Sequence, residues 1–441
     1  MAIKRIKRKI KKTAKPVISK EPVQKPQKQA KPKQEKPIVK KEQPKKSSPK
    51  PKQPKRNYND DYNESFSVVR GSRKLKLKKR VISFAVIALI ILSVILIHIL
   101  TPTGLVESIQ NKASTFGKGE LPATVYSQNS EQFLKYGDAV LTLNDSFFEV
   151  YSNNGKLMQA VSHGMSDPVL EVSEARFLIY DRSRYSISIF NYSSELYQTT
   201  FEHNIISADI SRSGAYAVVT DSDMYMNSVY VYNKNNKLVY TWNSATSYIT
   251  DVAVSNNGKS IAVALVNAKG GIYSSSVYVL DFKSASPKVK YDFDGLISSV
   301  SVLNSKFVLA NGTDKAMLLG ISSNSMTEIA ASSVRYFTSA SNGYSAVCHG
   351  RQNNEKDNTI TVISKKGEIT ANIKADYIVS SISLSDRYIA VHSEKTIILF
   401  DFEGNEIGRI TADTKPLFVA AVSKDFVLAL DNTRIYKLNL E

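Results

Sequence analysis

The sequence holds one cysteine, one tryptophan and five histidines in 441 residues. A single cysteine excludes an intramolecular disulfide and a cysteine-based zinc site. No histidine pair has the spacing of a zinc-protease helix, and no nucleophile elbow, phosphate-binding loop or calcium loop is present. Cys348, in the stretch YSAVCHG, is predicted to be a small buried strand residue. We therefore predict no catalytic, cofactor-binding or metal-ligating residues, and no cofactor.

Acidic residues do recur near the ends of predicted strands, at Asp181, Asp221, Asp281 and Asp401. Solvated turns account for acids at such positions. The densest pair, in Asp221-Ser222-Asp223, lacks the further alternating acids that a calcium loop needs. We interpret these residues as turn residues.

Positive charge is confined to one end of the chain. Residues 1–80 hold 29 Lys or Arg against 6 Asp or Glu, a net of +23, whereas residues 81–441 sum to −4. Nine of the 14 prolines lie between Pro16 and Pro54. With few apolar residues to bury, this segment cannot offset the entropy of ordering. We predict that residues 1–80 form a disordered, extended, basic cytoplasmic tail.

The basic tail has three interpretations. Attraction to anionic lipid headgroups comes first, because residues 1–12 also form a basic amphipathic pattern. Non-specific binding to nucleic acid or ribosomes is the second. The third is a solvated spacer with no partner. No zinc finger or RNA-recognition motif is present, so we do not expect specific nucleic-acid binding.

Only one stretch has a long unbroken apolar run, residues 81–100, VISFAVIALIILSVILIHIL. As a helix, about 20 residues rise roughly 30 Å, the hydrocarbon thickness of a bilayer. Six Lys or Arg residues between 73 and 80 precede the run, which places the N-terminus in the cytoplasm and residues 101–441 outside. A cleaved signal peptide is the alternative, but its basic region would be unusually long. We predict an uncleaved signal anchor in a single-pass protein of the cell membrane. An exported domain without disulfides fits a bacterium.

After a linker at residues 101–120, the composition turns to alternating Val, Ile, Tyr, Ser and Thr. Period-two or fully apolar segments indicate strands; examples are SVYVY (228–232), SVYVL (276–280), TITVI (359–363) and TIILF (396–400). Asn-Gly and Lys-Gly turn signals separate such segments. No amphipathic helix of ten or more residues follows residue 121, so residues 121–441 are predicted to be all-β.

A repeat underlies these strands. Each unit has a strand, a tight polar turn and a second apolar strand, and the turn-entry positions are Tyr136, Ser173, Ser211, Ser255, Leu303, Ser341, Ser385 and Ser423. Units of about 40–45 residues with four strands are typical of β-propeller blades. The last unit ends after three strands, and LPATVYS (121–127) is predicted to supply its fourth. We predict an eight-bladed propeller, with seven blades as the alternative and a β-sandwich pair as a third. The serines suit tight turns without any ligand.

The blade pattern resembles the WD40, PQQ-like and TolB-like propeller superfamilies over residues 121–441. Their functional motifs are missing, because no Trp-Asp dipeptide or Asp-box occurs and Trp242 is the only tryptophan. The layout also resembles an uncharacterised family of single-pass propeller proteins of Gram-positive bacteria, which contain a segment like FLIYDRSRYSISIF (177–190). That resemblance implies a location and a fold, and fold alone does not assign an activity.

The leading functional hypothesis is a non-enzymatic, membrane-anchored binding or scaffold module of the bacterial cell envelope. A rigid ring presents loops that bind proteins, peptides or glycans, and two long loops, at 266–276 and 349–358, are the predicted partner-binding sites. One alternative is an enzyme of glycan lyase or lactonase type, which needs acids or histidines from several blades in the central channel. The other is a sensor that relays binding to the tail, although 81–100 lacks the G-x-x-x-G dimerisation pattern.

Overall fold

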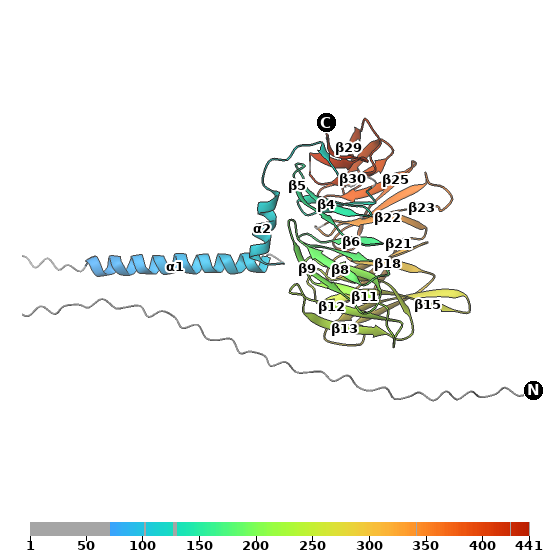
Figure 1. Cartoon of the computed structure of the whole chain (residues 1–441), viewed down its shortest axis with the longest axis horizontal. Coiled ribbons are helices and arrows are strands. Elements are labelled where there is room, and N and C mark those ends of the chain that lie inside the picture. The colour runs from blue at the N-terminus through green and yellow to red at the C-terminus, as the bar shows by residue number, and fades with distance from the viewer. Residues whose placement is uncertain (1–70, 101–102, 127–129, 341, 424, 441) are drawn as a thin grey trace, which may run out of the picture. The chain divides into compact units, whose positions relative to one another are not determined.

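The computed structural model describes residues 71–100, 103–126, 130–340, 342–423 and 425–440 (Figure 1). The predictions made for residues 1–70, including the amphipathic pattern at 1–12, lie outside the described residues. The same is true of the turn-entry residue Ser341.

Eight separate four-stranded antiparallel sheets make up the described part of the chain after residue 122. Blade 1 contains β2 (Gln132–Tyr136), β3 (Ala139–Leu143), β4 (Phe147–Ser152) and β5 (Leu157–Ser162). Blade 2 contains β6 (Pro168–Val172), β7 (Phe177–Asp181), β8 (Ser186–Phe190) and β9 (Glu195–Thr200). Blade 3 contains β10 (Ile205–Ile210), β11 (Tyr216–Thr220), β12 (Asn227–Tyr232) and β13 (Leu238–Ser244). Blade 4 contains β14 (Tyr248–Val254), β15 (Ser260–Lys269), β16 (Ile272–Asp281) and β17 (Val289–Asp294). Blade 5 contains β18 (Ile297–Val302), β19 (Phe307–Gly312), β20 (Ala316–Gly320) and β21 (Met326–Ala330). Blade 6 contains β22 (Ser333–Ser339), β23 (Ser345–Gly350), β24 (Asn358–Ile363) and β25 (Ile369–Ala375). Blade 7 contains β26 (Ser381–Leu384), β27 (Ile389–Ser393), β28 (Thr396–Phe400) and β29 (Glu406–Thr411).

Blade 8 joins the two ends of the domain. Its strands β30 (Phe418–Ala421), β31 (Phe426–Leu430) and β32 (Arg434–Asn439) are completed by β1 (Ala123–Thr124) from the other end of the domain. In the β1–β32 pairing, Ala123 lies opposite Ile435, and the N–H of Val125 donates to the carbonyl of Thr433 at 2.9 Å. The eight-bladed ring is therefore confirmed, and it is closed by Ala123–Thr124 of the predicted segment, so the seven-bladed alternative is wrong.

Apolar alternation determines how the blades pack. Many middle strands are buried on both faces, as in β3, β7, β11 and β20, whereas outer strands such as β5 and β9 alternate between exposed and partly buried residues. Each hydrophobic cluster draws residues from neighbouring blades, for example blades 1 and 2 around Tyr136 and Phe177. The core is thus a ring of inter-blade layers, because a single twisted sheet cannot bury its own faces.

Local hydrogen bonds explain the serines at the turn entries. The hydroxyl of Ser385 accepts the N–H of Tyr388 at 3.0 Å, and the hydroxyl of Ser211 donates to the carbonyl of Ala215 at 3.0 Å. Ser173 donates to the carbonyl of Arg176 at 2.7 Å in the same way. The serine column closes tight turns, as the sequence predicted.

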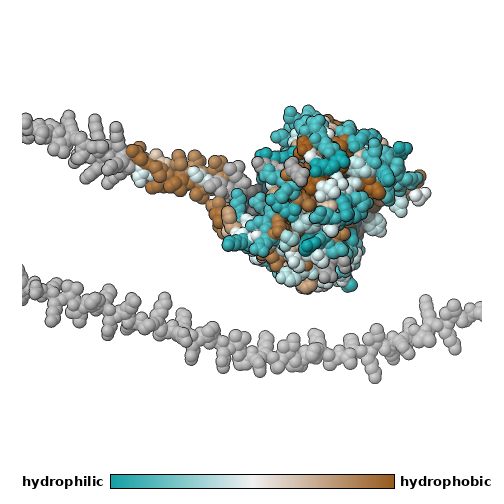
Figure 2. Space-filling view, turned by 90° about the horizontal axis from the view of Figure 1, so that it is seen from above, coloured by the Kyte–Doolittle hydropathy of each residue, from teal (hydrophilic) through white to brown (hydrophobic). Residues whose placement is uncertain are grey.

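Two helices precede the ring. The longer, α1 (Gly71–Leu100), exposes the described side chains from residue 81 to residue 96, and Figure 2 shows them as a nearly continuous apolar surface. Judged over the described residues, none of the helices meets the length and hydropathy needed to cross a bilayer. The second, α2 (Leu105–Thr115), occupies most of the predicted linker, and our sequence analysis did not anticipate it.

Candidate functional site

The connections of the blades divide the ring into two faces. In an up-and-down sheet, the first and third connections lie at one end of the strands and the second lies at the other, together with the link to the next blade. Helix α2 packs on first and third connections. We call the side of the ring that carries these connections the α2 face. We call the other side the far face; it carries the loops at 182–185, 221–226, 270–271 and 351–357. Figure 1 shows α2 and the tip of β15 on opposite sides of the ring.

Polar contacts hold α2 on blades 1 to 3. Arg176 donates from Nε and Nη2 to the two carboxylate oxygens of Glu107, both at 2.7 Å, and from Nη1 to the carbonyl of Lys234 at 2.7 Å. Both side chains are largely buried, at 9% and 12% exposure. Asn111 donates to the carbonyl of Ala175 at 3.0 Å. A bidentate, desolvated ion pair of this kind sets a definite orientation.

The predicted partner loop at 266–276 is a protruding β-hairpin. Strands β15 and β16 have ten residues each, and they are joined by Gly270 and Gly271, which both have positive φ angles. Two such residues suit the two-residue hairpin turn whose twist matches the strands. The tip exposes Ile272 and Tyr273, at 74% and 60%. A long sequence insertion therefore forms an extended hairpin arm instead of an irregular loop.

Further apolar side chains adjoin this arm on the far face. Met224, Tyr225 and Met226 of the loop after β11 are exposed, as is Tyr248 at the start of β14. The backbone brings them together, because the N–H of Met226 donates to the carbonyl of Ser244 at 2.9 Å and Tyr248 pairs with Val266. We call this set the far-face apolar patch; its members are Met224, Tyr225, Met226, Tyr248, Ile272 and Tyr273.

Three carboxyl groups face the central channel from neighbouring first strands. They belong to Glu171 on β6, Asp209 on β10 and Asp251 on β14. Asp209 Oδ2 accepts the N–H of Val254 at 2.5 Å, and Asp251 Oδ2 accepts the N–H of Val300 at 2.9 Å. Each bond ties one blade to the next. The aspartates thus accept backbone N–H groups at the free edge of the first strand of the next blade, where no neighbouring strand forms hydrogen bonds with them.

Withdrawal from bulk water raises the pKa of all three groups. The pKa of Asp209 rises to about 7, with a further contribution from the charge of Asp251, whose own pKa rises to about 6. The pKa of Glu171 is raised well above its usual value by burial and by the charges of Asp209 and Asp251. The carboxyl group of Glu171 makes no hydrogen bond or ion pair with any described residue. No sequence pattern indicates this cluster, because the acids come from three blades and lie about 40 residues apart.

These raised pKa values predict a pH-dependent stability. A carboxyl group whose pKa rises on folding binds its proton more tightly in the folded chain, so its contribution favours folding at low pH. That contribution is present below about pH 4, the usual pKa of an aspartate, and is lost as the pH rises through about 6 to 7. Asp209→Asn, which keeps an acceptor for Val254, should therefore melt at a higher temperature than the parent chain at pH 8, with little difference near pH 4.

The control for this experiment is Asp223→Asn, which changes an exposed acid of the far face. Thermal melts of the three chains from pH 4 to pH 8 give the measurement. A parent chain and an Asp209→Asn variant with the same melting temperature at every pH would contradict the prediction.

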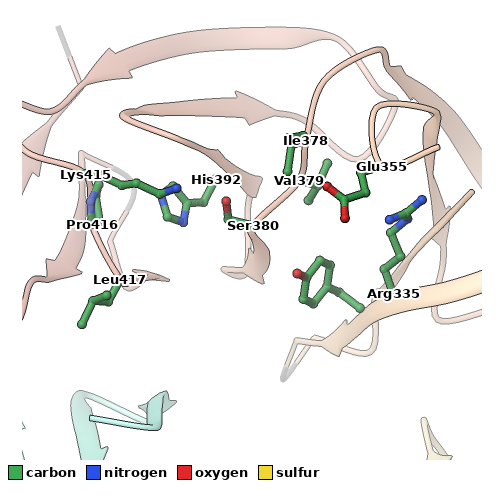
Figure 3. A pocket seen from close by; sticks show the side chains of 10 residues that line it. Arg335, Glu355, Ile378, Val379, Ser380, His392, Lys415, Pro416 and Leu417 are labelled. Atoms are coloured by element: carbon green, nitrogen blue, oxygen red, sulfur yellow. The ribbon is translucent and has the colours of Figure 1, made fainter. Parts of the chain in front are cut away.

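A pocket of about 420 Å³ opens on the far face between blades 6, 7 and 8 (Figure 3). Arg335 and Glu355 line one end and Lys415 the other, with Ser380 and His392 between them. Glu355 belongs to the second predicted partner loop, 349–358. The Nη2 group of Arg335 donates to the carbonyls of Arg351 and Asn354 at 2.9 and 2.8 Å, whereas its buried Nε has no acceptor among the described residues. The guanidinium of Arg335 is thus tied to the 351–357 loop of its own blade.

His392 forms the floor of this pocket and is 1% exposed. Its Nε2 lies 2.8 Å from the carbonyl of Glu394, so this nitrogen carries the proton. Burial lowers the pKa of His392, which leaves the ring neutral at pH 7. A neutral, fully engaged imidazole is a structural element of the wall.

The lone cysteine and the turn acid Asp401 behave as the sequence indicated, whereas Asp181 is not a solvated turn residue, because it is 7% exposed at the end of β7. Asp401 accepts the N–H groups of Glu403 and Asn405 at 3.0 and 2.8 Å, and Asp181 accepts those of Ser166 and Asp167. Cys348 is buried in β23, where burial raises its pKa to about 12. Among the residues that the structure describes, no three His, Cys, Asp or Glu side chains are placed to hold a metal ion.

A protein-family profile matches residues 117–440, the whole ring and its entry. The chain belongs to the family of unknown function DUF5711. This finding bears out the resemblance to an uncharacterised propeller family and leaves the Gram-positive membrane setting as a prediction. No curated protein matches the chain.

Solved structures similar to this DUF5711 member are also propellers. The C-terminal WD40 domain of Sif2 has a TM-score of 0.50 at 10% identity, covering 74% of this chain and all of that domain. BamB from Moraxella catarrhalis (TM-score 0.46, 12% identity, 73% of this chain and 100% of that one) and AztD from Citrobacter koseri (0.46, 14%, 68% and 88%) are similar as well. At these identities the similarity to Sif2 supports the fold alone.

Proposed function

We propose that this protein is a membrane-anchored, extracytoplasmic binding module of the bacterial cell envelope that has no enzymatic activity and uses its far face to bind a partner protein. The anchor in this proposal is the apolar run 81–100, supported by the basic residues at 73–80 and by the exposed apolar side chains of α1. The basic tail at 1–80 is proposed to contact anionic lipid headgroups of the inner leaflet.

The far-face apolar patch is the observation that carries the binding role. Its Tyr, Met and Ile side chains are the residue types that form the buried centre of protein interfaces. Ile272 and Tyr273 stand at the tip of the β15–β16 hairpin, where they pair with Lys269 and Ala268. Pairing to β14 and β17 holds the base of this hairpin as far as Val266 and Ser274, which limits the conformational entropy that binding would cost. Exposed apolar clusters rimmed by polar groups mark interaction sites on soluble domains.

Charge around the patch indicates the kind of partner. Exposed acidic side chains adjoin it in neighbouring loops; they are Glu202, Asp221, Asp223 and Asp294. Lys315, which donates to the carbonyl of Asp294, is one counter-charge among the described side chains. We propose a partner surface that presents apolar residues flanked by Lys or Arg, because such a surface complements the acidic rim.

Crosslinking in cells tests the partner surface. Ile272→Ser combined with Tyr273→Ser should remove the crosslinked partner without lowering the melting temperature, because both side chains are exposed. Ile407→Ser, at an isoleucine 51% exposed on β29, is the matched control and should leave the crosslink intact. An unchanged crosslink in the double variant, or attachment only to glycan, would contradict this assignment.

Fractionation and protease treatment test the anchor. The full chain should stay with membranes after alkaline carbonate washing, whereas deletion of 81–100 should release it. Protease added to intact protoplasts should cleave the propeller. A propeller that is protected until the membrane is lysed would reverse the proposed topology.

The second candidate is a propeller enzyme of glycan lyase or lactonase type, favoured by the carboxyl cluster in the channel. Carboxyl groups with raised pKa values are suited to general acid catalysis. Two of the three are, however, engaged by backbone N–H groups of the next blade. Turnover of a polyuronate or a lactone that Glu171→Gln abolishes would favour this candidate over the binding module.

A further inference from the structure

Helix α2 has its polar and apolar sides reversed relative to an ordinary surface helix. Its polar residues Glu107, Asn111 and Ser114 lie at i, i+4 and i+7, and Asn111 is 5% exposed against blade 2. The opposite side carries Val106 and Ile109, at 69% and 59% exposure, and Ala113 is exposed beside them. A helix that packs on a soluble domain normally buries its apolar side. An outward apolar side indicates a second, apolar environment.

The apolar side continues past the helix and is flanked by positive charge. Phe116 follows the last turn and is 75% exposed. Lys112 and Lys118 are exposed as well. Apolar side chains bordered by lysines are the pattern of helices that lie in the plane of a membrane interface. The aromatic ring and the lysines suit the headgroup level.

Chain length limits where α2 can be. Four residues separate Leu100, the last residue of the apolar run, from Leu105, the first of α2. Even fully extended, a link of this length spans less than about 20 Å. If the run 81–100 crosses the bilayer, α2 therefore begins at the outer surface of that bilayer.

We propose that the apolar side of α2 lies in the outer interface of the membrane, with Lys112 and Lys118 on anionic headgroups, so that the α2 face of the ring rests on the lipid surface. This inference rests on the proposed anchor. The Arg176–Glu107 pair then holds the ring to a helix that is itself fixed in the interface. The far-face apolar patch points away from the membrane, where a partner can reach it.

Site-directed fluorescence tests this contact in the full chain. Because the only native cysteine is fully buried, a cysteine placed on the surface can be labelled selectively. Ile109→Cys and Phe116→Cys carry an environment-sensitive dye, and Ile272→Cys on the far face is the matched control. The chain is reconstituted into vesicles of phosphatidylcholine and phosphatidylglycerol.

The dye at 109 and 116 should emit at shorter wavelengths than the dye at 272, and nitroxide-labelled lipids should quench only the first two. Vesicle flotation is measured on the same samples. Floating vesicles with an unquenched dye at 109 and 116 would overturn the contact while leaving the anchor intact. Failure of the full chain to float would overturn the anchor and this inference together.

Discussion

Replacing Val125 with asparagine should lower the free energy of unfolding by about 3 kcal/mol, because it puts an unpaired amide into the seam that closes the ring. Val125 is 3% exposed and packs in the cluster that contains Leu430 and Ile435. Its neighbour Tyr126 is 74% exposed, so Tyr126→Asn is the control and should change stability by less than about 0.5 kcal/mol. Urea unfolding of the two variants gives the comparison.

The seam is a sensitive site because β1 contributes only two paired residues. Supporting contacts come from blade 1, where the buried carboxylate of Glu149 accepts the N–H of Tyr126 at 3.1 Å. If Val125→Asn proved as mild as Tyr126→Asn, the closing strand would contribute little and the ring would be held by its other contacts.

Replacing Arg176 with methionine should weaken the docking of α2 by about 3 kcal/mol, because it leaves the carboxylate of Glu107 buried without its partner. Hydrogen exchange should then accelerate at the amides of α2, since an isolated helix of 11 residues is marginal in water. The propeller strands should keep their protection. This local loss distinguishes undocking of α2 from global unfolding.

Arg182→Met is the matched control, because Arg182 also pairs with an acid, Asp167, at 2.8 Å. That pair is 53% and 49% exposed, and exposed pairs contribute less than about 1 kcal/mol. Equal exchange rates at α2 in the two variants would show that the other contacts of α2 suffice. Undocking also matters for function, since α2 sets the orientation of the far face in the proposed arrangement.

The blade count could be derived from the sequence alone because it depends on local pattern. Period-two alternation and a turn every few residues specify a four-stranded unit, and a recurring unit that cannot bury its own faces has to stack on its neighbours. The three-stranded final unit identified LPATVYS as the closing segment for the same reason. Serine, asparagine and glycine recur at the tight turns of the units because these residues suit such turns.

Helix α2 was missed because its pattern is reversed, with apolar residues on the side away from the domain. Its remaining local signals were weak; they were Gly104 before the helix, Glu107 in its first turn and Lys112 in its last. A search for helices that bury an apolar stripe against the ring passes over such a segment.

The number of blades, the closure, the turn serines and the burial of Cys348 were thus determined by the sequence itself. Only the tertiary structure decided which distant residues meet: Glu107 with Arg176, the three carboxyl groups of the channel, and Arg335 with Lys415 in one pocket. The physical reason is distance along the chain. Strand pairing and turns act over a few residues, whereas these groups are brought together by the curvature of a closed ring, which no local pattern records.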